Sequence, residues 1–356
     1  IQNGRLFITL KSERIVLEEF SASIGSSDLH LSGTLVNVDG FITDRAESRP
    51  LFRFNFKSDL LDLDQILPVE ESQHAAAETW AWISPLYADE SIPDRTSPLI
   101  ALLRMLDMRG DVSINKLVSG GVLDDLTARI NSEGGKVAVT DISANVYGGL
   151  LKGSGSTDLT AAHAPFPAQM EVTVSGGQAG VVLEKFFNLP LRIQGSMSLK
   201  MSGSGRLDST LTLLTGSLEA NGIGNITDGQ ITNWGWLKDA AGGIAQLSFV
   251  DFDRIPIQDL VAPFKIEGGR LITRNLSMTA ADIPCKLSGS ARLADGTLDY
   301  TLDMDLPADR ITIGGINIGK ALGAFFGQSR ESKQVIPLQI RIGGTSARPK
   351  LAVAIR

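Results

Sequence analysis

Residues 298–306, Leu-Asp-Tyr-Thr-Leu-Asp-Met-Asp-Leu, decide the fold class of this chain. Every even position carries a large apolar or aromatic side chain, and every odd position carries Asp or Thr. A β-strand sends successive side chains to opposite faces, whereas a helix would spread these carboxylates around its circumference. The segment therefore predicts a strand with one apolar face and one water-exposed face, which is typical of antiparallel sheets.

The same alternation recurs over much of the chain. Residues 52–57, 170–174, 191–201 and 338–342 place apolar side chains at most second positions, with polar or charged side chains between them. Turn signals separate such runs, because Asp-Gly and Gly-Gly pairs accept the positive φ angles of hairpin turns. The turn signals are Val38-Asp39-Gly40, Glu133-Gly134-Gly135, Thr227-Asp228-Gly229, Glu267-Gly268-Gly269 and Ala294-Asp295-Gly296.

An internal repeat organises these strands. Residues 13–21, 135–143 and 269–277 align on one register, and each is followed by a glycine, namely Gly33, Gly153 or Gly289. The separations from the start of each segment to its glycine are 20, 18 and 20 residues. Strands with a single apolar face cannot bury that face alone, so we expect a repeated meander that stacks on its neighbours or curls.

Helical periodicity is rare and confined to short segments. It predicts helices over residues 98–108 and 180–188, and weaker ones over 236–247 and 318–326. Four prolines interrupt the strand rhythm within residues 68–98, which predicts an irregular connection carrying one short helix. The expected fold is mainly β, an elongated, curved antiparallel sheet: a half-pipe of repeated meanders with a few short helices.

Composition and charge exclude several classes of protein. The 356 residues carry a net charge of −7, and no Lys/Arg cluster offers the positive surface that a nucleic-acid-binding protein needs. The longest runs without a charged residue have 12 residues, as in Leu159–Met170, whereas a membrane-spanning helix needs about 20 apolar residues. The first residue is Ile1 rather than Met, so we expect a processed chain or a fragment.

Few residues could perform catalysis or hold a metal. Cys285 is the single cysteine, so an internal disulfide is impossible. The three histidines, His30, His74 and His163, are far apart in the sequence, so there are too few ligands for a His/Cys zinc site. The sequence contains no G-x-S-x-G nucleophile motif and no phosphate-binding P-loop. We therefore predict that the chain is not an enzyme and has no catalytic residue, no metal and no cofactor.

Three pairs of carboxylates leave an enzyme as an alternative. Asp62/Asp64, Asp251/Asp253 and Asp303/Asp305 are each two residues apart, which on a strand places both acids on one face. Such a pair could serve a glycosidase or bind a metal. Because the residues between and beside the acids are mainly apolar, the water-exposed side of a strand is the preferred interpretation.

The apolar faces themselves are the remaining candidate for function. They are rich in Leu, Ile and Met, and aromatic residues make up only 6% of the chain. One possibility is a dry core, with apolar faces packed against one another as in a β-sandwich. The other is a continuous trough that accepts acyl chains.

Several segments together resemble one protein family. Residues 145–155, Asn-Val-Tyr-Gly-Gly-Leu-Leu-Lys-Gly-Ser-Gly, are similar to a segment of the AsmA-like C-terminal region. Residues 335–345 with 348–351 resemble the closing strand pair of that family, and residues 58–67, 268–290 and 295–299 also fit its pattern. The resemblance covers most of the chain from about residue 99, and residues 1–67 more loosely.

The resemblance implies a location and a function. AsmA-like proteins are related to bridge-like lipid-transfer proteins, whose repeating β-groove carries phospholipid tails between membranes. It implies a periplasmic protein, held at the inner membrane by an N-terminal helix that this chain lacks. The implied partners are a phospholipid or another acyl-chain lipid and membrane proteins of the envelope.

The resulting hypothesis divides the chain into a groove repeat (1–67), the irregular connection (68–98) and an AsmA-like C-terminal groove region (99–356). It assigns a lipid-transfer function that supports outer-membrane assembly. The alternative is a structural or interaction scaffold of the envelope with a dry core and no lipid cargo. The predicted groove-lining residues are Phe52, Phe54, Phe56, Leu191, Ile193, Met197, Leu199, Met201, Leu298, Tyr300, Leu302, Met304, Leu306, Leu338, Ile340 and Ile342.

Overall fold

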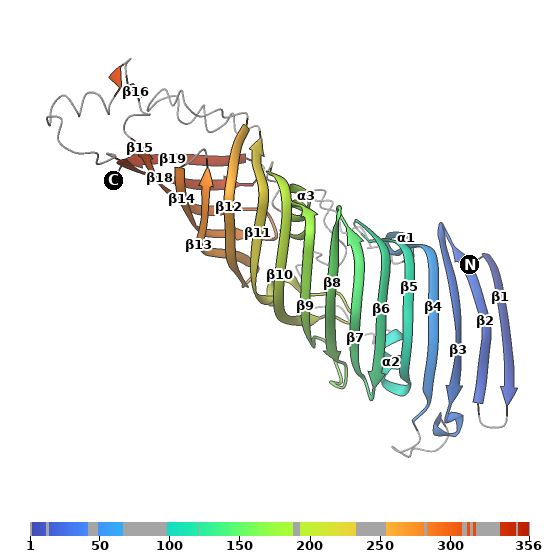
Figure 1. Ribbon diagram of the computed structural model, residues 1–356. Helices are drawn as coiled ribbons and strands as arrows, with labels where there is room; N and C mark the ends of the chain where they lie inside the picture. The colour runs from blue at the N-terminus through green and yellow to red at the C-terminus, as the bar shows by residue number, and fades with distance from the viewer. Residues whose placement is uncertain are drawn as a thin grey trace. The chain divides into compact units, whose positions relative to one another are not determined.

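Strands joined by short connections make up most of the protein, and the helices are few and short (Figure 1). The computed structural model describes residues 2–11, 14–41, 49–66, 98–119, 121–187, 193–232, 254–280, 283–307, 312–313, 316–317, 335–346 and 348–355. The predicted mainly β class is confirmed. Nearly all of the predicted connection over residues 68–98, and the helices predicted over 236–247 and 318–326, lie outside the described residues.

The chain forms two compact units. Unit 1 comprises residues 1–175 and 200–220, and unit 2 comprises residues 176–199 and 221–356. Strands β9 (Phe166–Gln178), β10 (Ile193–Leu207) and β11 (Glu219–Thr232) contribute residues to both units. The short helix η3 (Thr215–Ser217) lies between β10 and β11 in sequence.

Unit 1 contains two antiparallel runs joined by one parallel pair. This agrees with the predicted mainly antiparallel sheet, and the β4–β5 pair is parallel because a crossover connects the two strands. That crossover includes the helices α1 (Leu63–Ile66) and α2 (Pro98–Met105). The other elements are β1 (Gln2–Lys11), β2 (Arg14–Ile24), β3 (Ser27–Val36), η1 (Val38–Phe41), β4 (Leu51–Asp62), β5 (Asp107–Val118), β6 (Val122–Glu133), β7 (Lys136–Val146) and β8 (Gly149–Asp158).

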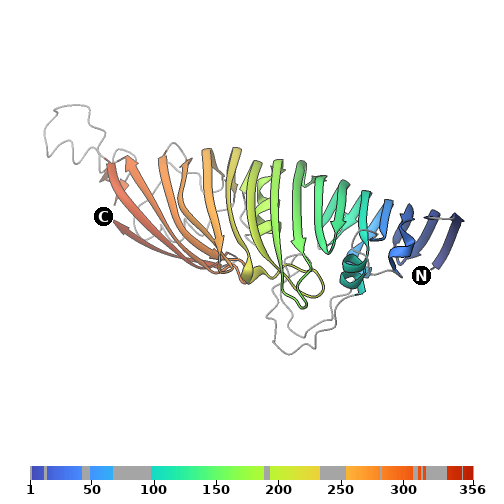
Figure 2. The same ribbon diagram turned by 90° about the horizontal axis from the view of Figure 1, so that it is seen from below.

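Unit 2 contains an antiparallel run of six strands and the helix α3 (Ala179–Phe187). In Figure 1, β12 stands upright whereas β18 and β19 lie across the picture, and the view in Figure 2 shows that these strands bend along their length. The strands are β12 (Arg254–Glu267), β13 (Arg270–Ala280), β14 (Ile283–Arg292), β15 (Leu298–Pro307), β18 (Val335–Thr345) and β19 (Arg348–Ile355). Two further strands, β16 (Thr312–Ile313) and β17 (Ile316–Asn317), pair only with each other.

The alternation in residues 298–306 appears in the structure as predicted. In β15, Tyr300 and Leu302 are buried, whereas Asp299 and Asp305 are exposed. The register with β18 places Leu302 opposite Ile340, so buried residues of adjacent strands share one face.

The three repeat segments carry a bulge at the same position. In the pairs β2–β3, β7–β8 and β13–β14, the register is interrupted between Leu17 and Phe20, between Val139 and Ile142, and between Thr273 and Leu276. These residues occupy equivalent positions of the aligned segments. A bulge bends its strand and increases the local twist, so the repeat specifies curvature as well as strand order.

The structure corrects the predicted spacing of the second repeat. The first and third repeats place Gly33 and Gly289 opposite the last residue before the bulge. In the second repeat Gly155 holds that position, whereas Gly153 pairs beyond the bulge. Gly155 follows Gly135 by 20 residues, so the separation of 18 residues rested on the wrong glycine. The two glycines lie on the same face of one strand, and only the pairing distinguishes them.

Three predicted turns join adjacent strands, and one prediction is wrong. Residues 133–135, 267–269 and 294–296 connect β6 to β7, β12 to β13 and β14 to β15. Residues 38–40 lie in η1. The turn predicted at residues 227–229 lies inside β11, where Asp228 has a φ of 51° within a continuing strand. A strand accommodates such a residue as a local irregularity, so a Gly-containing signal does not always end it.

The helix predicted over residues 98–108 is α2, which ends at Met105 because the next residues enter β5. Its Ile100 and Leu103 side chains are buried with Leu159 and Phe166. The Arg104 guanidinium donates from Nε to the Leu159 carbonyl oxygen at 2.7 Å and lies 5.6 Å from the centroid of the Phe166 ring. These contacts fix α2 at one end of the strands of unit 1.

Candidate functional site

A cavity of about 1100 Å³ lies within unit 2 and is the candidate site. Ligand sites in proteins commonly have volumes of roughly 300–1,000 Å³, so this cavity is large. Its walls come from α3, from the last residue of β9 and from strands β10–β15, β18 and β19. The strands contribute mainly their apolar faces, and the polar neighbours Gln194 and Thr232 also line the wall, beside Ile193 and Ile231.

Six of the predicted groove residues line this cavity: Ile193, Met197, Leu298, Tyr300, Leu302 and Ile342. Leu338 and Ile340 belong to the adjoining buried cluster described below, and Met304 is partly buried and packs against that cluster. Leu199 is buried in unit 2 but is not part of the wall.

The remaining predicted residues lie elsewhere. Phe52, Phe54 and Phe56 are half-buried on β4 of unit 1, and the rings of Phe52 and Phe54 stack with their centroids 5.7 Å apart. Met201 is buried and also belongs to unit 1. Leu191 and the side chain of Leu306 lie outside the described residues. A role in lipid binding remains a prediction for every member of the set.

Helix α3 forms a wall that the sequence did not assign to the site. The helix predicted over residues 180–188 is observed at 179–187. Its Val181, Leu183 and Phe187 side chains line the cavity, and Phe187 packs edge-to-face on Phe264 of β12 with ring centroids 5.5 Å apart. Its apolar residues predicted the helix, but nothing in the local sequence indicated which strands it would cover.

Strands β11–β14 contribute a second group of residues that the sequence analysis did not single out. They alternate with polar residues in the same way as the predicted set, so the period of two would have identified many of them. The group is Ile226, Ile231, Ile257, Leu260, Ala262, Phe264, Leu271, Leu276, Met278 and Leu287.

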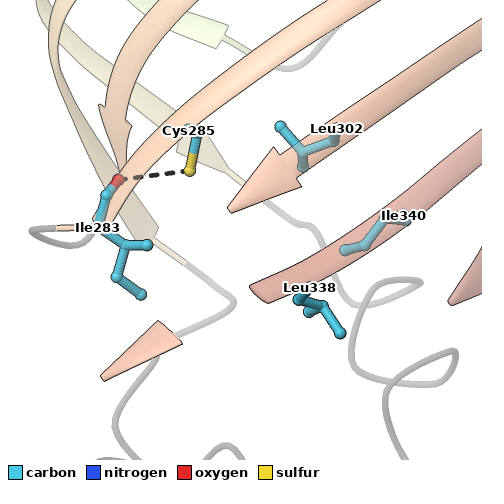
Figure 3. Close-up of a cluster of buried hydrophobic side chains, with 5 residues drawn as sticks. All are labelled: Ile283, Cys285, Leu302, Leu338 and Ile340. Carbon is cyan, nitrogen blue, oxygen red and sulfur yellow. Dashed lines mark hydrogen bonds between the residues drawn. The ribbon is translucent and has the colours of Figure 1, made fainter. Parts of the chain in front are cut away.

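A buried cluster adjoins the cavity at the ends of β14, β15 and β18. Figure 3 shows its five members, Ile283, Cys285, Leu302, Leu338 and Ile340, on neighbouring strands. The Cys285 thiol donates to the Ile283 carbonyl oxygen at 3.3 Å, and burial raises the pKa of the thiol to about 11. Leu302 belongs both to this cluster and to the cavity wall, so the cluster continues the apolar face of β14, β15 and β18 beyond the cavity.

Polar groups in the cavity wall are few. The Tyr300 hydroxyl shares a hydrogen bond with the Thr273 side chain, and burial raises the pKa of Tyr300. Glu184 on α3 is the one charged side chain among the described residues of the wall. Its Oε1 lies 3.6 Å from the Lys185 Nζ, and half of the glutamate side chain is exposed. The wall is thus apolar with a carboxylate at its exposed part.

The carboxylate pairs within the described residues lie away from the cavity wall. Asp303 follows Leu302 on the opposite face of β15 and accepts a hydrogen bond from Gln339 Nε2 at 2.9 Å. Asp62 ends β4 and accepts hydrogen bonds from the backbone amide and side chain of Gln65. Asp251 and Asp253 lie outside the described residues. Over the described part of the chain, no group of three or more His, Cys, Asp or Glu side chains could hold a metal ion.

Comparison with known families places the chain. The model of the AsmA family matches residues 1–232. The chain belongs to the AsmA family. The match in this AsmA-family protein includes the Tyr147-Gly148-Gly149 segment, and the resembling segments after residue 268 lie beyond it. Neither a curated protein nor a solved structure gives a match to the chain.

The described helices of this AsmA-family protein are all short. None of them has the length and apolar character needed to cross a membrane.

Proposed function

We propose that this AsmA-family protein binds lipid acyl chains in the cavity of unit 2 and takes part in lipid transport between the membranes of the cell envelope. The observation that carries the proposal is the cavity of about 1100 Å³, whose wall is formed mainly by Leu, Ile, Val, Met and Phe side chains. Membership of the AsmA family supports the same function. The protein would act in the periplasm as a carrier rather than an enzyme, anchored to the inner membrane.

The mechanism is the removal of acyl chains from water. Each methylene transferred from water to an apolar wall gains roughly 0.8 kcal/mol, so about a dozen methylenes gain roughly 10 kcal/mol before entropic costs. Because most side chains of the wall are apolar, they offer few hydrogen bonds that would fix the acyl chain in one position. Tight sequestration is thereby compatible with sliding of the lipid along the wall.

Two residues of β13 provide a matched test. Leu276 lines the cavity, whereas Ser277 is exposed and follows it on the strand. We expect Leu276→Glu to lose bound lipid, because a carboxylate would enter the apolar wall, and Ser277→Glu to retain it. The measurements are mass spectrometry of lipid extracted from the purified protein and displacement of a fluorescent fatty acid, with circular dichroism to check folding.

The proposal fails if the folded wild-type protein carries no lipid and if no fluorescent fatty acid can be displaced from it. That result would favour the scaffold with a dry apolar core. Equal lipid content in the two variants would also contradict the assignment of this wall to the lipid.

A further inference from the structure

The described wall of the cavity carries a negative charge and no positive one. Among its described residues no Lys or Arg is present, and Glu184 supplies the only charge. The other polar members are neutral amides and hydroxyls, including Gln178 on the strand before α3 and Gln194 on β10. A phosphate bound at this wall would therefore meet the Glu184 carboxylate and no Lys or Arg of the described wall.

Glu184 lies where a lipid headgroup can reach it. Its side chain is half exposed, in contrast to Val182 and Phe187 of the same helix, which are buried. The headgroup of a lipid whose tails occupy the cavity must remain at the water-exposed part of the wall, because burial of a charged group is costly. Among the described wall residues, Glu184 is the charge that such a headgroup would meet.

The neighbouring lysine leaves this carboxylate able to bind a second cation. Lys185 Nζ approaches Oε1 at 3.6 Å and does not line the cavity. An exposed ion pair of this kind contributes about 0–1 kcal/mol. A carboxylate has two oxygens and several acceptor positions, so it can accept a hydrogen bond from another ammonium group.

We propose that Glu184 determines headgroup specificity, favouring lipids that carry an ammonium group, such as phosphatidylethanolamine, over anionic lipids such as phosphatidylglycerol. The inference rests on the proposed function, because it assumes that the cavity holds the tails. An ammonium group gains the carboxylate as a partner, and an anionic headgroup is repelled by it. At an exposed site these interactions correspond to about a two- to five-fold difference in affinity.

Glu267 offers a matched control for Glu184. It lies in the same unit, its side chain has the same exposed fraction of 50%, and it pairs with a lysine, Lys265, at 2.9 Å. It does not line the cavity. The variants Glu184→Gln and Glu267→Gln therefore remove equivalent charges, one inside the site and one outside it.

The experiment titrates the full chain with phosphatidylethanolamine and phosphatidylglycerol that carry identical fluorescent acyl chains. We expect the wild type and Glu267→Gln to prefer phosphatidylethanolamine two- to five-fold, and Glu184→Gln to bind both lipids equally. Glu184→Lys should reverse the preference. Because the Debye length shortens as salt increases, the wild-type preference should decrease at high ionic strength.

The outcomes separate the two proposals. Binding of neither lipid overturns the proposed function together with this inference. Equal binding of both lipids by the wild type, or an unchanged preference in Glu184→Gln, overturns the headgroup inference alone. Loss of the preference in Glu267→Gln would also overturn it, because the effect would then come from the net charge of unit 2.

Discussion

Gly289 of β14 lies opposite Thr273, the last residue of β13 before the bulge, and its substitution by alanine should destabilise unit 2. A Cβ at this position would lie 2.1 Å from the carbonyl oxygen of Asp299 and 2.6 Å from the Cα of Tyr300. Both atoms belong to the backbone of β15, so no side-chain rotation relieves the contact. The φ of +147° is in addition a conformation that residues with a side chain rarely adopt.

The magnitude follows from these two terms. A residue held in a sparsely populated backbone region costs about 1–3 kcal/mol. Displacement of β15 by an inserted methyl group costs about 1–3 kcal/mol, as in overpacked cores. We therefore expect Gly289→Ala to lower the free energy of unfolding by about 2–6 kcal/mol.

Two other glycines separate the terms. Gly268 has a φ of +56° and nothing within 4 Å of a Cβ, so Gly268→Ala should show the backbone term alone, about 1–2 kcal/mol. Gly155, the equivalent of Gly289 in the second repeat, has its nearest atom, the Gln169 carbonyl oxygen, at 3.4 Å, and its φ is not in the left-handed region. Gly155→Ala should therefore change stability by less than about 1 kcal/mol.

Urea unfolding of the full chain, followed by far-ultraviolet circular dichroism, measures these differences, and hydrogen exchange of the β13–β15 amides assigns them to unit 2. The expected order of destabilisation is Gly289→Ala, then Gly268→Ala, then Gly155→Ala. A Gly289→Ala protein no less stable than Gly268→Ala would refute the reasoning, because the close backbone approach would then have no energetic consequence.

Three further predictions concern other parts of the molecule. Burial by itself would raise the pKa of Asp28, but hydrogen bonds from the amides of Leu60 and Asp59 outweigh it and hold this pKa below its ordinary value. The ionised Asp28 carboxylate therefore stabilises the folded protein above the pKa of the unfolded state, and this stabilisation is lost as the pH falls through the folded pKa. Asp28→Asn should lower the free energy of unfolding by about 1–3 kcal/mol at pH 7 and by less below pH 3, as measured by urea unfolding. Because burial raises the pKa of Cys285 to about 11, Ellman's reagent should label it slowly in the folded chain and fully in urea. Arg104→Gln should destabilise unit 1 by about 1.5–3 kcal/mol and increase hydrogen exchange in α2, because a charged hydrogen bond to Leu159 is lost.

Each of these predictions has a control or a contradicting result. For Asp28, an unchanged pH dependence of stability in the asparagine variant would show that the amide contacts contribute nothing. Rapid labelling of Cys285 in the folded chain would contradict its burial. Arg109→Gln is the control for Arg104, since Arg109 is exposed on β5 and should change little. Equal effects of the two arginine substitutions would contradict the docking of α2 through Arg104.

Local patterns predicted the elements well where the determining interactions are themselves local. Alternation over residues 298–306 identified β15 and its buried face, and the helix predicted over 180–188 is α3 within one residue. The Gly268-Gly269 turn was predicted because glycines tolerate positive φ whatever their surroundings. The turn predicted at residues 227–229 failed because a strand partner can hold a positive-φ residue inside a continuing strand.

By itself, the sequence determined that the chain is built of strands with one apolar face, repeated in meanders, because the period of side chains along a strand is a property of consecutive residues. Tertiary structure alone decided which apolar faces surround a cavity and which pack into a cluster. Phe187 meets Phe264, and Met197 lines the same wall as Leu302, although about 80 to 105 residues separate each pair. Such contacts depend on strand register, on the positions of the bulges and on the strands against which α3 packs, and no stretch of neighbouring residues specifies them.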